Sequence, residues 1–339
     1  MTALLEVNDL VVRYPSGSLM DRLRGEPRDV TVLDGVSLTL GPGETLGLVG
    51  ESGSGKTTLG RAIGGLTPMA SGSITLAGAS ATGEKDGFWR EMRRNVGFMF
   101  QDPMAALDPR MRLAASITEP LAVNGAGRAE RRRRAGELLA EVGLSPDFAG
   151  RFPHQISGGQ ARRVTVARAL ALRPKLVIAD EPTAGLDLSV QGELLNLLNA
   201  IQAASAVSFL FITHNLAVAR HVTDRIAVMY LGRIVESART AEIFARPAHP
   251  YTRALLSAHG RPGAPPPLKG EVPSLKRRPR GCAFHTRCPL AAELCRREAP
   301  AERILGPLHQ VRCHFPLATA GDAAPHAFPA PPEPARSTP

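Results

Sequence analysis

Short apolar stretches separated by polar segments recur along much of the chain. Residues 5–14 and 32–40 alternate apolar and polar side chains, which predicts two β-strands, the first at the edge of a sheet. Residues 46–49, 175–179 and 209–212 are instead almost continuously apolar. A short apolar run bounded by turn residues predicts a strand that is buried on both faces.

Helical periodicity occupies the intervals between these strands. It begins at Thr57, dominates residues 107–172 and returns at 190–203. Strands that alternate with helices predict an α/β fold in which a parallel sheet is covered on both faces. Two segments break the pattern: residues 15–29, rich in Gly, Pro and Arg, predict a loop insertion, and the Ala- and Pro-rich residues 318–339 predict a disordered tail.

The composition is that of a globular protein without a membrane span. The chain has 339 residues, enough for one large or two modest domains, and only 4% of them are aromatic. No run of eighteen apolar residues is present, so we expect a soluble chain. Residues 1–6 lack the basic flank and apolar core of a signal peptide, which predicts a cytoplasmic location.

The net charge of +10, carried mostly by Arg, raises the question of an anionic partner. Both nucleic acid and an anionic membrane surface attract such a chain. The densest Arg run lies within residues 128–139, where Glu130 precedes Arg134 by about one helical turn. This spacing favours a solvated helix face with an ion pair, so we expect no nucleic-acid partner.

A glycine-rich segment directly after residues 46–49 predicts a phosphate site. It fits the pattern G-x-x-x-x-G-K-[ST], in which backbone N–H groups cradle nucleotide phosphates. The lysine of the pattern reaches the β- and γ-phosphates, and the hydroxyl after it meets Mg²⁺. The predicted ATP-binding residues are Gly50, Glu51, Ser52, Gly53, Ser54, Gly55, Lys56, Thr57 and Thr58.

A second anion-binding element follows in the helical region. It precedes a long helical pattern, and backbone N–H groups at such a helix start attract phosphate. One triphosphate rarely needs two cradles within one chain. We therefore expect two chains to face each other, so that each ATP lies between the lysine loop of one chain and this turn of the other. The residues of the turn are Ser157, Gly158, Gly159 and Gln160.

An acidic pair, Asp180 and Glu181, ends the apolar run at 175–179. This is the sheet edge where α/β proteins bind ligands. The pair predicts a division of labour. Asp180 holds Mg²⁺, through water, and Glu181 orients or deprotonates the water that attacks the γ-phosphate.

Together these motifs resemble the ATP-binding subunits of ABC transporters. The resemblance implies a P-loop ATPase fold with a parallel-sheet core, an antiparallel β edge and a helical subdomain at residues 103–172. It also implies that Gln101, in the glutamine loop, contacts Mg²⁺ and the attacking water, and that His214 is the switch histidine at the γ-phosphate. Asp187 matches the loop that crosses the dimer interface, and Tyr14 matches the aromatic residue that stacks on adenine.

Departures from the family pattern are mild. Ile156 replaces the usual Leu, Ala161 stands where Arg is frequent, and Ala184–Gly185 replace a more common Ser-Ala. None of these changes removes a catalytic group. We therefore expect a competent ATPase.

The C-terminal region resembles one branch of this family. Residues 249–256 and 281–289 match the C-terminal extension of the ATPases of oligopeptide and dipeptide importers, and nickel and glutathione importers share parts of it. The insertion at 15–29 resembles the second, F-type ATPase of such a pair. The implied domains are an ATP-binding domain at 1–245, the C-terminal extension at 246–317 and the tail at 318–339.

All four cysteines lie in this extension. Cytoplasmic chains rarely form disulfides, so the clustering favours a metal or iron–sulfur site. Five, six and seventeen residues separate successive cysteines, spacings wider than the C-x₂-C pairs of zinc ribbons. Four thiolates suit a [4Fe–4S] cluster, which close relatives carry there, and zinc or free thiols are the alternatives. The predicted ligands are Cys282, Cys288, Cys295 and Cys313.

These features predict the ATP-hydrolysing subunit of a membrane importer for di- and oligopeptides. Nickel, glutathione or another small solute is the alternative cargo. A soluble ABC-type ATPase acting on DNA is the alternative of another class, but no sustained heptad run for its coiled coils is present. A P-loop kinase or GTPase would leave Ser157–Gln160 without a purpose. The implied partners at the cytoplasmic face of the membrane are two permease subunits, an extracytoplasmic solute-binding protein and a second ATPase chain, identical or not.

Overall fold

The computed structural model describes residues 3–15, 29–82, 88–257 and 270–317. The predicted tail and most of the predicted loop insertion lie outside these ranges. The strands are β1 (Leu5–Pro15), β2 (Asp29–Leu40), β3 (Thr45–Val49), β4 (Ser71–Leu76), β5 (Ala79–Ala81), β6 (Val96–Met99), β7 (Leu176–Asp180), β8 (Ser208–Thr213), β9 (Arg225–Tyr230), β10 (Arg233–Arg239), β11 (Arg303–Gly306) and β12 (His309–Val311). The α-helices are α2 (Lys56–Ile63), α3 (Phe88–Asn95), α4 (Leu113–Ile117), α5 (Glu119–Val123), α6 (Arg128–Glu141), α7 (Gly158–Ala169), α8 (Leu188–Ser205), α9 (Leu216–Val222), α10 (Thr240–Ala245), α11 (Pro250–Ser257) and α12 (Glu293–Arg297), and 3-10 turns lie at Pro146–Gly150, Pro153–Gln155 and Leu275–Arg277.

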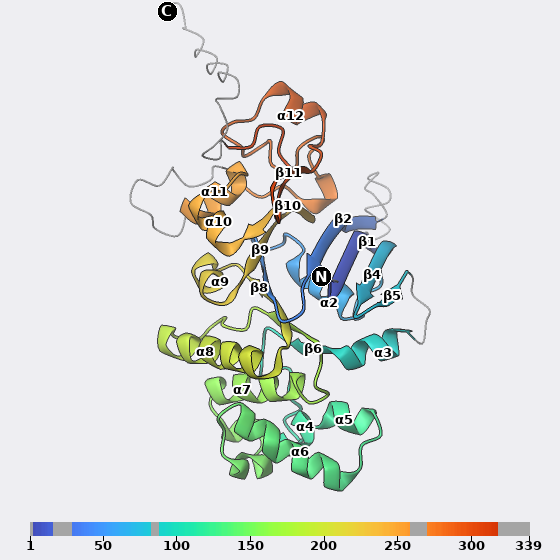
Figure 1. The fold of residues 1–339 in the computed structure, drawn as a ribbon, viewed down its shortest axis with the longest axis vertical. Helices are drawn as coiled ribbons and strands as arrows, with labels where there is room; N and C mark the ends of the chain where they lie inside the picture. Colours follow the sequence, from blue (N-terminus) through green and yellow to red (C-terminus); the bar gives the residue numbers. More distant parts are fainter. Residues whose placement is uncertain (1–2, 16–28, 83–87, 258–269, 318–339) are drawn as a thin grey trace, which may run out of the picture.

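An eight-stranded sheet with the order β11-β12-β10-β9-β3-β8-β7-β6 forms the core (Figure 1). Its strands from β9 to β6 run parallel. Leu176 and Ile178 of β7 belong to the apolar cluster that includes α2, and the alternate residues Val177 and Ala179 belong to the cluster that includes α7 and α8. Both faces of the sheet are therefore covered, as the continuous apolar runs predict.

A second, four-stranded antiparallel sheet has the order β2-β1-β4-β5. The strand expected at residues 5–14 is present as β1, but its predicted place at a sheet edge is wrong. It pairs with both β2 and β4, with Leu5 opposite Leu40 on one side and Leu76 on the other. Apolar–polar alternation reports which face of a strand is buried, and it carries no information on how many neighbours the strand has.

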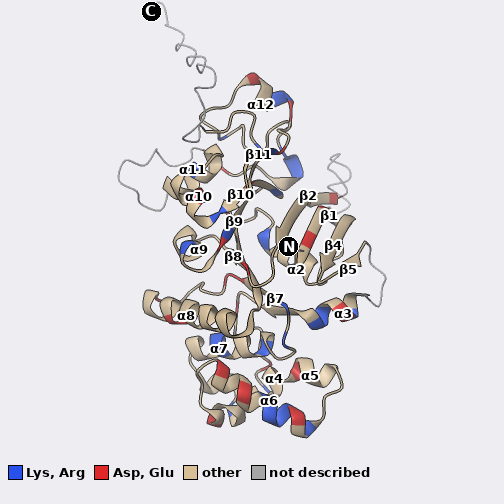
Figure 2. Cartoon of the chain, in the orientation of Figure 1, with Lys and Arg blue, Asp and Glu red and all other residues tan. Residues whose placement is uncertain are grey.

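The segment between β6 and β7 is predominantly helical, as expected, and lies at the bottom of Figure 1. Figure 2 shows acidic and basic residues interspersed on α6, in keeping with a solvated face. The expected ion pair between Glu130 and Arg134 is replaced by another, because Arg134 is buried and binds Glu137 and Glu141 at 3.2 and 2.7 Å. Among the described residues, no helix is both long and apolar enough to cross a bilayer.

The C-terminal residues extend the core sheet. β12 pairs with β10 through Glu236 and Val311, and β11 adds the outermost strand. Glu236, 1% exposed, accepts hydrogen bonds from the backbone N–H groups of Ala248 and His249 and lies 3.0 Å from Nε2 of His309. Burial lowers the pKa of His249 to about 4, so its ring is neutral at pH 7. This buried network joins β10, the start of α11 and β12 into one packed unit.

Candidate active site

The predicted phosphate loop joins β3 to α2 at the carboxyl edge of the parallel strands. Gly50 has a φ of 156°, and a Cβ there would lie 2.2 Å from the carbonyl oxygen of Met229. Gly55, the residue before α2, has a φ of 103°, a conformation that favours glycine. The loop therefore turns tightly into the start of α2, where free N–H groups and the helix dipole favour an anion.

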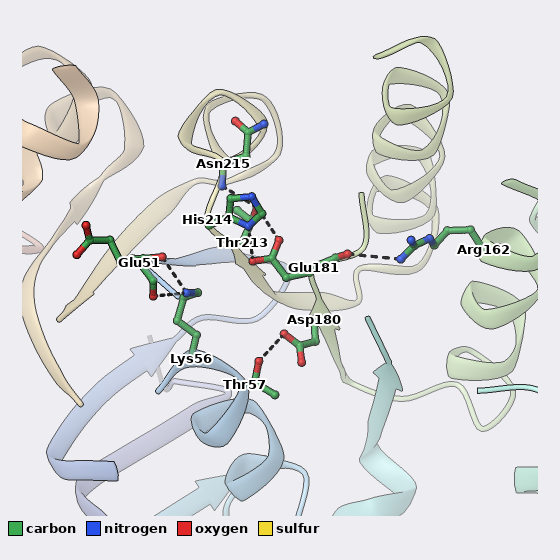
Figure 3. A network of polar contacts seen from close by, with 10 residues as sticks. Glu51, Lys56, Thr57, Arg162, Asp180, Glu181, Thr213, His214 and Asn215 are labelled. Carbon is green, nitrogen blue, oxygen red and sulfur yellow. Dashed lines mark hydrogen bonds and ion pairs between the residues drawn. The ribbon is translucent and has the colours of Figure 1, made fainter. Parts of the chain in front are cut away.

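Lys56 lies inside this loop and is only 7% exposed. Its Nζ donates hydrogen bonds to the carbonyl oxygens of Gly50 and Glu51, at 2.8 and 2.9 Å (Figure 3). Burial lowers the pKa of Lys56, and the charges of Glu181, Asp180 and Glu51 oppose that shift. An ammonium group held only by backbone carbonyls is available to exchange them for phosphate oxygens.

Oxygen ligands suited to Mg²⁺ meet beside Lys56. The hydroxyl of Thr57, the next residue, donates to Oδ1 of Asp180 at 3.1 Å. Asp180 ends β7, and burial raises the pKa of its carboxyl. A hydroxyl and a carboxylate in contact beside a phosphate loop match the few protein ligands that Mg²⁺ keeps when phosphates and water supply the others. The third predicted ligand, Gln101, is exposed two residues after β6, the strand next to β7.

Glu181 and His214 form a second polar pair at the same edge. Oε1 of Glu181 lies 2.8 Å from Nδ1 of His214, and the hydroxyl of Thr213 lies 3.4 Å from Oε2. Figure 3 shows Glu181 between His214 and the phosphate loop residues. Glu181 has a φ of 48°, a left-handed conformation that costs a non-glycine residue about 1–3 kcal/mol. Such strain is typical of residues that the surrounding fold holds for a function.

Arg162 reaches this region from α7 and was not among the predicted residues. It is 4% exposed and donates to the carbonyl oxygens of Gln101 (2.9 Å), Ala184 (2.7 Å) and Glu181 (3.4 Å). Burial lowers the pKa of its guanidinium. One side chain thus connects the loop after β6, the end of β7 and the segment before α8. The signal available in the sequence is weak. Arg162 precedes Thr165 by three residues, so the two lie on the same face of α7, but this spacing alone does not show that the arginine is buried.

The predicted Ser157–Gln160 turn starts α7, in a different element from the phosphate loop. Ser157 caps the helix: its Oγ accepts from the N–H of Gln160, whose side chain accepts from the N–H of Ser157. Ser157 and Gly158 are exposed. Asp187 is exposed too; it caps α8 through the N–H of Val190, and the following Leu188 is 86% exposed. Both segments therefore lie at the surface of the chain.

Tyr14, the predicted adenine contact, lies on β1 opposite Val30. It is 37% exposed, and its hydroxyl lies 3.4 Å from the hydroxyl of Thr67. A half-exposed ring can accept a stacking partner. Its contact with adenine stays a prediction.

The four cysteines converge on one pocket in the C-terminal region and none is in a disulfide. Burial raises the pKa of Cys288 to about 11 and that of Cys313 to about 12, so these thiols are neutral at pH 7. The space between the side chains is about 10 Å³, room for about one water molecule. No group of three or more His, Cys, Asp or Glu among the described residues is placed to hold a metal ion. The four thiols are therefore gathered at one narrow pocket, but as they stand they do not form a metal site.

Comparison with known proteins places these motifs in a family. The family described as "ABC transporter" matches residues 33–184, and the one described as "Oligopeptide/dipeptide transporter, C-terminal region" matches residues 235–295. The oligopeptide transport ATP-binding protein AppF of Bacillus subtilis is 43% identical over 322 residues, which cover 92% of this chain and 97% of that protein. The chain belongs to the ATP-binding proteins of peptide-type ABC transporters.

Other members of this family match at similar length. A provisionally named peptide import ATP-binding protein of Brucella abortus is 48% identical over 317 residues, covering 92% of this chain and 94% of that one. The oligopeptide transport ATP-binding protein OppF of Escherichia coli is 43% identical over 306 residues, covering 88% and 92%. The family assignment made from the motifs is confirmed.

Solved ABC ATPases share the fold. The ATP-binding cassette MJ0796, described as a dimer bound to ADP and Pi after hydrolysis, superposes with a TM-score of 0.60 at 28% identity and covers 70% of this chain and 98% of its own. cbiO1 of Clostridium perfringens, described as part of an ABC transporter complex, gives a TM-score of 0.62 at 26% identity and covers 72% and 92%. This ABC protein is accordingly an α/β P-loop ATPase that uses ATP with Mg²⁺.

Proposed function

We propose that this chain is the ATP-hydrolysing subunit of an ABC importer for di- and oligopeptides. The observation that carries the proposal is the grouping of Lys56 with the Thr57–Asp180 and Glu181–His214 pairs at one sheet edge. Relatives named for oligopeptide transport match nearly the whole chain, which supports the peptide cargo.

The chemistry and position of each residue suggest its part. Lys56 exchanges two backbone carbonyls for β- and γ-phosphate oxygens. Thr57, Asp180 and Gln101 would hold Mg²⁺, which neutralises charge that develops on the phosphates. Glu181 orients or deprotonates the attacking water, and His214, beside it, contacts the γ-phosphate.

The exposed turn would complete the site of a second subunit. Ser157, Gly158, Gly159 and Gln160 present a helix start at the surface, and such a start attracts phosphate. Asp187 and the apolar Leu188 beside it lie at the surface, where the interface loop of the family is expected. Each ATP would then lie between the phosphate loop of one subunit and the Ser157 turn of the other. MJ0796 is described as a dimer, which supports this arrangement.

The transport role requires partners that the chain does not itself supply. These are two membrane permease subunits, an extracytoplasmic solute-binding protein and a second ATPase chain, which is either another protein or a second copy. The site of action would be the cytoplasmic face of the membrane. In this arrangement residues 1–245 bind ATP and residues 246–317 form the extension typical of peptide importers.

The cysteine pocket is part of the proposal. The four cysteines are the candidate ligands of a [4Fe–4S] cluster, with zinc as the alternative, because all four line one pocket and remain free thiols. The pocket has to open to admit either. Iron and sulfide analysis of anaerobically purified protein tests this: four irons per chain are expected, and protein with neither iron nor zinc would leave four structural thiols.

The catalytic assignment is tested with Glu181→Gln. We expect the variant to bind Mg-ATP like the wild type and to hydrolyse it about 10²–10³-fold more slowly, because the base or orienting carboxylate is lost. The matched control is Glu193→Gln, an exposed carboxylate on α8 that pairs with Arg163. Near-normal phosphate release by Glu181→Gln would contradict the assignment.

The cargo is tested in proteoliposomes that contain the chain with its permeases and binding protein. We expect ATP hydrolysis to rise when a peptide is added. Stimulation by Ni²⁺ or glutathione, with none by peptides, would contradict the peptide assignment.

A further inference from the structure

Glu51, the second residue of the phosphate loop, is held by two residues of the C-terminal region. Its backbone N–H donates to the hydroxyl of Tyr251 at 2.9 Å. Its carboxylate accepts two hydrogen bonds from Arg287, at 2.6 and 3.0 Å. Neither Tyr251 nor Arg287 belongs to a nucleotide-binding motif of the sequence.

Both contacts come from well-packed side chains. Tyr251 is fully buried, and its ring lies 4.7 Å from that of Tyr230 and 5.3 Å from that of Phe284. The Arg287 side chain is 6% exposed, against 28% for Glu51. The hydrogen bonds to Glu51 raise the pKa of Arg287. A two-point contact between a guanidinium and a carboxylate fixes orientation as well as charge.

Because Glu51 lies in the phosphate loop, its contacts with Tyr251 and Arg287 affect the binding of an anionic ligand there. Its carbonyl oxygen accepts from Lys56, so its N–H, its C=O and its side chain are all engaged. Figure 3 shows its carboxylate pointing away from Lys56. A carboxylate next to a triphosphate site repels the phosphates unless a cation neutralises it. Arg287 is that cation.

We propose that Arg287 and Tyr251 are positioning residues for ATP binding. Arg287 neutralises Glu51 and turns its carboxylate out of the phosphate site, and Tyr251 holds the backbone of the loop through the Glu51 N–H. The C-terminal extension thereby acts as an outer wall of the nucleotide site. The inference rests on the proposed function, since it requires that this loop binds ATP.

The test compares Mg-ATP affinities in the slowly hydrolysing Glu181→Gln parent by titration with a fluorescent ATP analogue. We expect Arg287→Gln to bind about tenfold more weakly, because the Glu51 charge is left uncompensated. Adding Glu51→Gln to Arg287→Gln should restore affinity to within about twofold of the parent, because the repelling charge is gone. Tyr251→Phe, which keeps the ring, should weaken binding about threefold through one lost hydrogen bond.

The rescue separates positioning from folding. A residue that serves only the packing of the extension would not be rescued by removing its partner's charge. Arg287→Lys keeps the charge without the two-point contact, so its affinity should lie between those of the parent and Arg287→Gln. The matched control is Arg297→Gln, an exposed arginine of the same extension paired with Glu293, and its affinity should equal that of the parent.

Steady-state hydrolysis by the otherwise wild-type chain gives a second measurement. Arg287→Gln should raise KM for ATP about tenfold and leave kcat within about twofold, because the chemistry at Glu181 is untouched. Unchanged affinity of Arg287→Gln, or equal weakening of Arg287→Gln and its double variant, would overturn the inference alone. A parent chain that binds no Mg-ATP would overturn the proposed function together with it.

Discussion

The phosphate loop and the Ser157 turn both lead into a helix start, but the chain supports them differently. Lys56 donates a hydrogen bond to a backbone carbonyl of its own loop, and Tyr251 and Arg287 of the C-terminal region bind Glu51. Ser157 and Gln160 cap each other and the turn lies at the surface. The first cradle is organised within one chain, and the second lies exposed, where we propose that it serves a partner subunit.

Because of this difference, substitutions in the two elements should affect different measurements: ATP binding by a single chain and ATP hydrolysis by the assembled complex. Changes in the phosphate loop should alter ATP binding by a single chain. If the turn meets ATP held by another subunit, as proposed, changes in the Ser157 turn should leave that binding intact and should alter hydrolysis in the assembled complex.

The largest effect is expected for Lys56→Met. Affinity of the isolated chain for Mg-ATP should fall at least about a hundredfold, because charge-assisted hydrogen bonds to the phosphates are lost. Equilibrium binding of a fluorescent ATP analogue measures it. Lys175→Met, at an exposed lysine just before β7, is the control and should bind normally. If Lys56→Met bound Mg-ATP within about threefold of the wild-type affinity, the assignment of the phosphate loop as the chain's own ATP-binding element would be contradicted.

A smaller effect, on turnover alone, is expected at Ser157. Ser157→Asp and Ser157→Asn both keep a good helix cap, so the two variants should have equal melting temperatures. The aspartate places a negative charge opposite the phosphates of the neighbouring subunit, so ATP hydrolysis by the assembled transporter should fall at least about tenfold relative to Ser157→Asn.

The contrary results at Ser157 are distinct. Weaker ATP binding by the isolated Ser157→Asp chain would mean that the turn serves its own subunit. Equal hydrolysis by the Asp and Asn variants would mean that no phosphate approaches it.

Next in size is Arg162→Met, which tests how the two cradles communicate. Three carbonyl oxygens lose their charged donor, which should lower the free energy of unfolding by about 2–3 kcal/mol. The loops after β6 and β7 also lose a shared anchor, so kcat should fall about fivefold with little change in ATP affinity. Denaturant unfolding and phosphate release measure the two effects. Arg162→Lys keeps the charge but cannot reach all three carbonyl oxygens. Full ATPase activity of both variants would mean that Arg162 does not hold the loops after β6 and β7 for catalysis.

The sequence predicts the local parts of this site because each is encoded in consecutive residues. An apolar run followed by the glycines around Lys56 defines strand, loop and helix start. Asp180 and Glu181 directly follow an apolar strand, and parallel strands bring such ends to one edge. The parallel core and the helical segment are predictable for the same reason.

Contacts between distant segments have no comparable signal. Arg287 and Glu51 are 236 residues apart in the chain, and no periodicity connects them. The strands β11 and β12 have four and three residues, and β11 is largely exposed, so neither has the apolar pattern of a core strand. The interior place of β1 also depends on partners, β2 and β4, that its own alternation does not identify.

The smallest effect is expected at Asp187, where the predicted interface loop becomes α8. Its carboxylate accepts the N–H of Val190 at 3.0 Å and caps a helix of 18 residues. Asp187→Ala should lower the free energy of unfolding by about 1 kcal/mol, since the first turn loses its side-chain acceptor. Asp187→Asn retains a capping oxygen and should stay within about 0.5 kcal/mol of wild type in denaturant unfolding. Equal losses in the two variants would mean that the charge of Asp187, rather than its cap, stabilises this surface, and the interface loop would then be held by electrostatics.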